Sequence, residues 1–105
     1  MRVLRIFDVK AKPDCAGTLL KKFATTSAAV VEGEPGNQGY FYGQGAEGQQ
    51  DMVMFVSIWE SMEAVKTRFG VDWQESFLPA GYEDLIETCS VRHVLVDSGW
   101  KVPVA

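Results

Sequence analysis

The run MVMFVSIW, residues 52–59, carries apolar side chains at both alternating sets of positions. Alternate residues of a β-strand point to opposite faces of a sheet, so a strand with this sequence needs cover on both sides. One face of the strand carries Met52, Met54, Val56 and Ile58, and the other carries Val53, Phe55 and Trp59. The fold must therefore place this strand in a sheet that is covered on both faces.

Three other segments are also typical of strands. Residues 2–10 alternate between two faces and are rich in β-branched and aromatic side chains, and residues 86–96 alternate in the same way. An aromatic strand opens at Tyr40 to Tyr42, and the glycine-rich stretch 43–51 predicts a turn between it and 52–59. We expect these two strands to pair as a hairpin.

Two segments have helical spacing. Apolar residues recur at steps of three and four from Ala16 to Val31, after a start that Pro13 and Asp14 indicate, with Asp14 expected to accept free amide hydrogen bonds. The stretch 33–39, rich in glycine, ends this helix. Ser61 predicts the amino-terminal cap of a second helix, which Gly70 stops.

Asp72 and Glu75 have the spacing of a capping box. This spacing predicts one or two more helical turns over residues 73–78, closed by Pro79 and Gly81.

The element order is β, α, β, β, α, β, which predicts an α+β fold of the ferredoxin-like class, a four-stranded antiparallel sheet with both helices on one face. The opposite face of the sheet then has no cover within the chain. A two-fold dimer can bury such a surface against its own copy. We therefore expect a homodimer that forms through this face.

Length and charge limit the classes of protein. A chain of 105 residues with 47% hydrophobic content predicts a single domain, 1–105, with an irregular tail over 96–105 that Trp100 anchors. The net charge of -4 argues against nucleic acid as a partner. No apolar run suits a membrane span or a secretory signal, and Cys15 and Cys89 are too few for a disulfide framework, so we expect no membrane partner and a cytoplasmic location.

Three stretches carry a resemblance to a known family: VSIWESMEAVKTRF, VDWQESF and ETCSVRHVLV. With them the chain resembles the antibiotic biosynthesis monooxygenase-like family of dimeric α+β barrels. The resemblance implies a possible monooxygenase, an oxidoreductase that acts without an added cofactor on a small aromatic or quinone-like substrate. Other relatives degrade haem, and fold likeness alone does not fix the reaction.

The haem-degrading members resemble one another in an Asn, a Trp and a His at three positions. The corresponding positions in this sequence hold Phe7, Arg68 and Leu78. The resemblance therefore does not extend to haem degradation, because the iron would lack its axial nitrogen.

His93 is the only histidine and shares a strand face with Val91 and Leu95. It is the candidate catalytic residue, because a cofactor-free oxygenase must take a proton from a phenolic substrate before electrons pass to O2. The alternative, which base rates favour, is a hydrogen-bonded core or interface histidine.

Several aromatic residues are candidate walls for a flat ligand. Trp59 is more typical of a strand-to-helix corner that seals the core, whereas Trp73 lies on a segment that could act as a lid, and both interpretations stay open. The candidate substrate-binding residues are Phe7, Phe55, Trp59, Trp73, Phe77, Tyr82 and Arg92, with Phe41 as a further aromatic in the same set. Ordinary core packing is the alternative for each of the phenylalanines and for Tyr82.

Arg5 and Arg92 lie on strands that should be neighbours in a ferredoxin-like order. A charged head among apolar side chains needs a carboxylate, for which Asp8 or Glu87 is the candidate. Each arginine is therefore either part of an interface salt bridge, which is favoured, or an anchor for a substrate anion. Cys89 has no activating neighbour in the sequence and is typical of an inert buried thiol.

One histidine with no cysteine or carboxylate cluster predicts no metal site. Three functions remain: a cofactor-independent oxygenase, a non-catalytic dimeric module that binds a small apolar ligand or has a vestigial pocket, and a protein-interaction subunit with no pocket. The first two differ in whether a polar proton-transfer group faces the pocket. A His93 that pointed into the dimer interface would favour the second.

Overall fold

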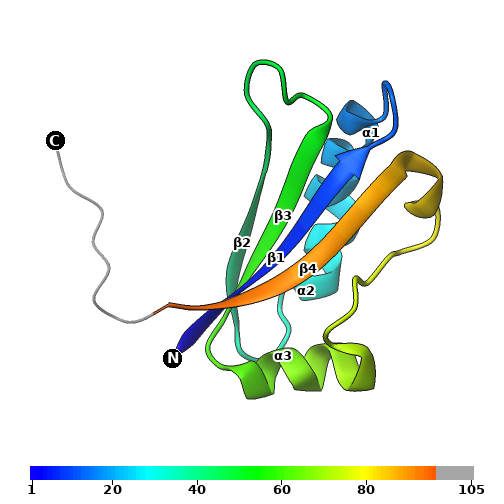
Figure 1. Cartoon of the computed structure of the whole chain (residues 1–105). Helices are drawn as coiled ribbons and strands as arrows, with labels where there is room; N and C mark the ends of the chain where they lie inside the picture. Colours follow the sequence, from blue (N-terminus) through cyan, green and yellow to red (C-terminus); the bar gives the residue numbers. More distant parts are fainter. Residues whose placement is uncertain (97–105) are drawn as a thin grey trace, which may run out of the picture.

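The computed structural model describes residues 1–96 (Figure 1). Four strands form one sheet in the order β2-β3-β1-β4, and each neighbouring pair is antiparallel. The strands are β1 (Arg2–Ala11), β2 (Asn37–Gln44), β3 (Met52–Trp59) and β4 (Ile86–Val96). The predicted ferredoxin-like α+β fold is confirmed. The tail predicted beyond β4, with Trp100, lies outside the described residues.

The helices lie on one side of the sheet (Figure 1). The first helical segment is continuous but changes type, with α1 (Ala16–Lys22), the π-helical turn η1 (Phe23–Ser27) and α2 (Ala28–Val31). The second is α3 (Met62–Phe69), followed by the 3₁₀ turn η2 (Gly70–Asp72), and η3 (Glu83–Leu85) leads into β4. Among residues 1–96, no helix is long and apolar enough to cross a membrane.

The start of the first helix differs from the expectation. Asp14 was expected to cap it, but Asp14 has φ +64, a left-handed backbone conformation, and α1 begins at Ala16 without a side-chain cap. The turn closes instead through a hydrogen bond from the Cys15 amide to the Lys12 carbonyl. The capping prediction for Asp14 is wrong because a backbone turn occupies the position that a cap would need.

The second helix begins and ends as predicted. The Ser61 hydroxyl accepts a hydrogen bond from the Ala64 amide, and Gly70 follows the last helical residue with φ +72. The predicted helical turns over 73–78 are absent, and this prediction is wrong. Glu75 and Asp72 share only one backbone turn bond, so the segment between η2 and η3 runs as an irregular connection over the sheet.

The core lies between the helices and the sheet face formed by the odd-numbered residues of β1 and β3. Register pairs on this face include Val3 with Trp59, Phe7 with Phe55 and Val9 with Val53. Leu19 and Phe23 of the first helix pack into the same cluster, fully buried. Period-two alternation in the strands and period-four spacing in the helix therefore produce one shared apolar interior.

No helix of the described part of the chain lies on the opposite face of the sheet (Figure 1). Ile6 and Val56 are register partners on this face and are buried at its centre, whereas Phe41 and Met52 are 45% and 40% exposed. An apolar patch of this kind on a small protein is typical of an interaction surface.

Candidate functional site

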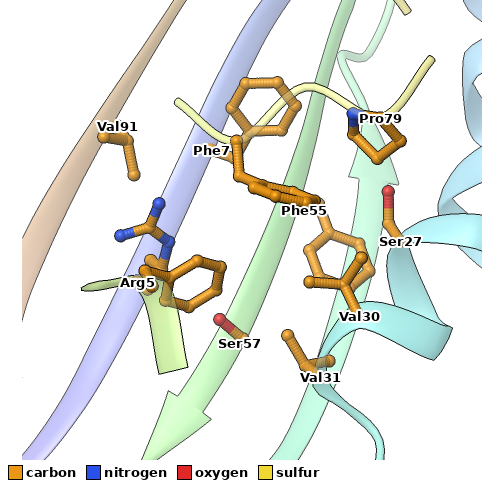
Figure 2. A pocket seen from close by; sticks show the side chains of 11 residues that line it. Arg5, Phe7, Ser27, Val30, Val31, Phe55, Ser57, Pro79 and Val91 are labelled. Atoms are coloured by element: carbon orange, nitrogen blue, oxygen red, sulfur yellow. The ribbon is translucent and has the colours of Figure 1, made fainter. Parts of the chain in front are cut away.

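A cavity lies between the helices and the covered face of the sheet (Figure 2). Its interior measures about 40 Å³, about the room of three water molecules, and its empty space is about 430 Å³ when the open mouth is counted. The lining residues are Arg5, Phe7, Ser27, Val30, Val31, Phe55, Ser57, Phe69, Phe77, Pro79 and Val91. The walls are thus mostly apolar, with three polar side chains among them.

Among the described residues that line the cavity, only Arg5 carries a charge. Its side chain is 5% exposed, and Nη1 and Nη2 donate hydrogen bonds to the carbonyl oxygens of Trp73 and Glu75. The guanidinium lies over the Phe69 ring at 3.8 Å from its centroid. Burial, and to a lesser extent the nearby Arg68 cation, lower the pKa of Arg5 to about 10, which leaves it charged at neutral pH.

The sequence suggested that Arg5 needs a carboxylate partner, and the structure shows a different solution. Among residues 1–96, Arg5 forms no ion pair. Two backbone carbonyls from the segment after η2 replace the carboxylate, and an aromatic face covers the cation. The irregular course of residues 73–75 places these carbonyls, which explains why the segment does not continue as a helix.

His93 lies on the same face of the sheet as Arg5, which is its register partner on β1. Its Nε2 is 3.0 Å from Arg5 Nη1, and because arginine cannot accept a hydrogen bond, Nε2 is the unprotonated acceptor. The imidazole packs edge-on against Trp73, with ring centroids 5.2 Å apart. Burial first, and the Arg5 charge second, lower the pKa of His93 below its ordinary value of 6.5, so the ring is neutral at neutral pH.

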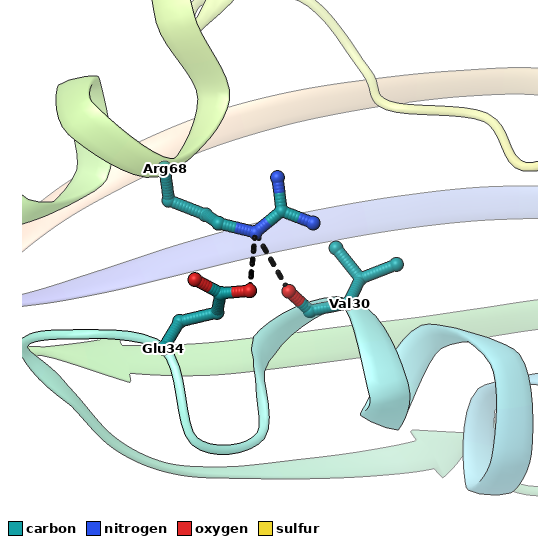
Figure 3. Close-up of polar contacts among 3 residues, drawn as sticks. All are labelled: Val30, Glu34 and Arg68. Carbon is teal, nitrogen blue, oxygen red and sulfur yellow. Dashed lines mark hydrogen bonds and ion pairs between the residues drawn. The ribbon is translucent and has the colours of Figure 1, made fainter.

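Arg68 adds a second positive charge beside the lining residue Val30 (Figure 3). Its Nε donates to the Val30 carbonyl at 2.8 Å and lies 3.5 Å from a carboxylate oxygen of Glu34. The guanidinium also lies over the rings of Phe69 and Phe77, at 5.3 and 5.8 Å from their centroids. These contacts join α3 to the end of α2 and hold Val30 and Phe69 in the wall.

The π-helical turn shapes another part of the wall. Tyr82 is fully buried, and its hydroxyl donates to the Lys22 carbonyl and lies 2.7 Å from Ser27 Oγ. Because the single Tyr82 hydrogen goes to Lys22, the Ser27 hydroxyl is the donor in the second bond. A π-helical turn widens a helix locally, and here it brings Ser27 to the cavity.

The structure brings some of the expected site residues together and separates others. Phe7, Phe55 and Phe77 line the cavity, and Trp73 reaches it through its carbonyl bond to Arg5. Trp59 and Tyr82 are fully buried beside it, as parts of the core. Trp59 stands at the strand-to-helix corner, where its Nε1 donates to Ser57 Oγ at 2.8 Å.

Arg92 lies outside the cavity. It is a register partner of Ile6, so it projects from the face without helices, where its Nε is 3.6 Å from Asp8. Phe41 also lies on that face. Sequence reasoning did not place Ser27, Ser57 or Phe69 at the site, and only the shared strand face of Ser57 and Phe55 pointed toward it.

Cys15 and Cys89 are both free and partly buried. Within residues 1–96, no group of three or more His, Cys, Asp or Glu side chains could hold a metal ion.

Comparisons with known proteins agree with this fold. The family model described as Antibiotic biosynthesis monooxygenase matches residues 2–70. No curated protein has a sequence that matches the chain significantly. Among solved structures, a candidate antibiotic biosynthesis monooxygenase from Deinococcus radiodurans has a TM-score of 0.73 at 14% identity, with 97% of this chain and 99% of that chain covered.

Two further structures are similar. PA3566 from Pseudomonas aeruginosa has a TM-score of 0.69 at 17% identity, with 92% of this chain and 95% of that chain covered. The heme-degrading protein Rv3592 from Mycobacterium tuberculosis has a TM-score of 0.64 at 23% identity, with 98% and 100% covered. At these identities the likeness shows the fold.

Proposed function

The chain belongs to the antibiotic biosynthesis monooxygenase family, and we propose that it is an oxygenase that oxidises a small aromatic or quinone-like molecule in the cavity between the sheet and the helices. One observation carries the proposal: a buried cation, Arg5, lines a cavity whose other walls are mainly phenylalanine and valine. Such walls suit a flat apolar ring, and a few placed polar groups orient it.

In this proposal the substrate itself supplies the electrons, so no added cofactor is required. For the ring methylene of an anthrone, two C–H bonds break and one oxygen atom of O2 forms a new carbonyl. The second oxygen atom leaves as water with both hydrogens. The methylene carbon loses four electrons and O2 gains four, so the reaction balances without another reductant.

We propose that His93 acts as a positioning residue in this site. Its Nε2 lone pair accepts from Arg5 and does not face the cavity, so the imidazole orients the guanidinium. A phenolic or enolic substrate would then lose its proton to solvent, with the positive Arg5 favouring the anion. Phe7, Phe55 and Phe77 would form the walls around the ring.

The lining residues of this cavity do not fit haem. The one imidazole beside the cavity directs Nε2 at Arg5, 3.0 Å away, and so offers no free nitrogen to the iron. Phe7 occupies a wall position and offers no ligand atom. No step of the proposed reaction therefore passes through haem.

A second function has a specific observation in its favour. Among residues 1–96, the cavity lining contains no free general base, because Arg5 is its one titratable group. A module that binds a small aromatic ligand without converting it would need none. Turnover of a bound substrate separates this function from an oxygenase.

We also propose that two chains associate through the sheet face without helices. Phe41, Met52 and their apolar neighbours Ile58 and Val94 lie on this face, and the Arg92 to Asp8 ion pair lies among them. Self-association would bury this surface and complete the double cover that the sequence of β3 requires.

Oxygen consumption with a panel of anthrones and hydroquinones tests the oxygenase proposal. Val91→Phe adds a ring inside the cavity, so we expect kcat/KM for an accepted substrate to fall about tenfold or more. Val71→Phe is the matched control, because Val71 is 94% exposed and lies away from the cavity. Its rate should equal that of the wild type.

Equal rates in wild type and Val91→Phe would place the reaction elsewhere and contradict the proposal. No oxygen uptake by the wild type across the panel, together with binding of the same compounds, would favour the non-catalytic module.

A further inference from the structure

We propose that Arg5 and Ser57 form an oxyanion-binding subsite in the cavity, which selects planar aromatic ligands that carry a single negative oxygen group. This inference deepens the proposed function, because it names the chemical class of the ligand for the same site. It depends on the count of hydrogen-bond donors that face the cavity.

Arg5 keeps unused donors. A guanidinium has five N–H groups, and three of them have partners: Nη1 donates to Trp73 and to His93, and Nη2 donates once to Glu75. Within residues 1–96, Nε–H and the second Nη2–H have no partner. No side-chain nitrogen without a partner is sealed from solvent there, so Arg5 Nε is accessible, and because Arg5 lines the cavity we take Nε–H as the donor that is open to a ligand.

Ser57 keeps an unused donor as well. It is 3% exposed and lines the cavity beside Arg5, its register partner on the neighbouring strand (Figure 2). The indole of Trp59 can only donate, so Ser57 Oγ is the acceptor in the bond between them. Within residues 1–96 no acceptor takes the Ser57 hydroxyl hydrogen, which therefore stays available to a ligand oxygen.

The third polar side chain of the lining has the opposite character. Ser27 donates its hydrogen to Tyr82, whose own hydrogen goes to Lys22. Ser27 therefore offers only lone pairs to the cavity and would repel an anion. Figure 2 shows Ser27 across the cavity from Arg5, so the negative group of a ligand should lie at the Arg5 and Ser57 end.

No protein group in the lining neutralises the cation. The lining contains no aspartate or glutamate, and Arg5 forms no ion pair within residues 1–96. The carboxylate of Glu34 pairs with Arg68, and neither residue lines the cavity. A buried charge gains most from an opposite charge that displaces its water, and here a ligand anion is the group that can supply it.

The apolar walls of the cavity determine the shape of the uncharged part of the ligand. Phe7, Phe55 and Phe77 line the same space, which favours a flat ring. Phenolates, enolates and aromatic carboxylates share this chemistry of a ring with one anionic oxygen group. A phenolate or enolate has one anionic oxygen and a carboxylate has two, and the test below compares the two kinds of anion.

Binding of three compounds of similar size tests the inference: 4-nitrophenol, 4-nitrobenzoate and neutral nitrobenzene. None is a substrate for the proposed oxidation, so failure of catalysis does not affect the result. We expect the wild type to bind either anion at least about tenfold more tightly than nitrobenzene. Bound 4-nitrophenol should also ionise at a lower pH than in solution, which its nitrophenolate absorbance reports.

Arg5→Gln should remove the preference for the anions over nitrobenzene, and Ser57→Ala should weaken that preference about threefold to tenfold. Arg2→Gln is the matched control, because Arg2 lies on the same strand but is exposed, and within residues 1–96 its side chain bonds only to Gln38. Thermal unfolding verifies each fold, and Ser57→Ala carries the test if Arg5→Gln does not fold.

Preferred binding of nitrophenolate assigns a phenolate site, and preferred binding of nitrobenzoate assigns a carboxylate site. Equal affinity for charged and neutral compounds, or no binding of any of them, would overturn the inference. Anion binding without oxygen uptake would support the subsite and contradict the oxygenase.

Discussion

At the scale of single residues, Arg5 and His93 act as one unit. The imidazole accepts from the guanidinium only in its neutral form, because a protonated ring has no lone pair to offer. The pKa of His93 is lowered, first by burial and second by the Arg5 charge, and both causes favour that neutral form. Protonation of His93 would place two cations 3.0 Å apart.

This coupling predicts how stability depends on pH. The folded pKa of His93 lies below the unfolded value of 6.5, so the unfolded chain takes up the proton at higher pH. The contribution of His93 to stability is therefore complete above pH 6.5 and is lost as pH falls through the folded pKa. Between pH 7 and pH 5, wild type should lose more unfolding free energy than His93→Gln.

Urea titrations at stepped pH measure this difference, and the carboxylates common to both proteins cancel in it. An NMR titration of the imidazole provides an independent reading. A His93 pKa above 6.5 in the folded protein would contradict the expected geometry.

The sequence identifies residue types better than it identifies their partners. An arginine among apolar positions predicted a charge that needs compensation, and the structure contains such a charge at Arg5. Its partners could not be predicted, because they are the backbone carbonyls of Trp73 and Glu75. Every residue has such a carbonyl, so the sequence does not show which ones will bind the arginine. The role of Ser57 could not be predicted either, since it depends on the hydrogen bond that the Trp59 indole donates to its hydroxyl oxygen.

At the scale of elements, α3 is docked through a glycine in the loop before β2. Gly36 accepts a hydrogen bond from the Glu60 amide at 2.9 Å, directly before the helix. A Cβ at Gly36 would lie 2.5 Å from the Cβ of Ala64, and the residue has φ +83. Gly33, three residues earlier, has a similar φ of +76 but open space around it.

These two glycines form a matched pair. Gly33→Ala should destabilise the protein by about 1–2 kcal/mol, the cost of a left-handed conformation alone. Gly36→Ala should cost about 1–3 kcal/mol more, because α3 must also move away from the loop. Urea unfolding of both variants measures the difference, and equal losses would show that the helix does not rest on Gly36.

Elements with a strong periodic pattern were predicted well, including β3 and β4, whose bounds match residues 52–59 and 86–96. The π-helical turn was not, because FATTS carries ordinary helical spacing. The bonds that accompany the turn come from Tyr82, far along the chain. The segment 73–78 was also mispredicted because of a contact with a distant residue. Arg5 on β1 bonds the carbonyls of Trp73 and Glu75.

At the scale of the whole molecule, the sheet has two unlike faces. One is packed against the helices and contains the cavity, and the other presents Phe41, Met52 and the Arg92 to Asp8 ion pair. The helices cannot reach the second face, because both connections cross the sheet on the same side (Figure 1). The proposed association of two chains depends on that asymmetry.

Sedimentation equilibrium tests this association. We expect wild type to have twice the 11.6 kDa mass of one chain, and Phe41→Lys to shift the protein toward the single chain by placing a charge in the contact. Val71→Lys is the control, because Val71 is more exposed but lies beyond α3 and away from the sheet face. A wild type that stays at 11.6 kDa at micromolar concentration would contradict the proposal.

Arg5 is held by backbone carbonyl oxygens, so the side chains of the residues that supply them can change without loss of these bonds. The oxygen at position 75 belongs to the main chain, so exchange of the Glu75 side chain removes no acceptor for the guanidinium. Gln74 is exposed beside it and is equally free to vary. A library randomised at these two positions would therefore change the side chains of this short stretch while the backbone that anchors Arg5 stays in place.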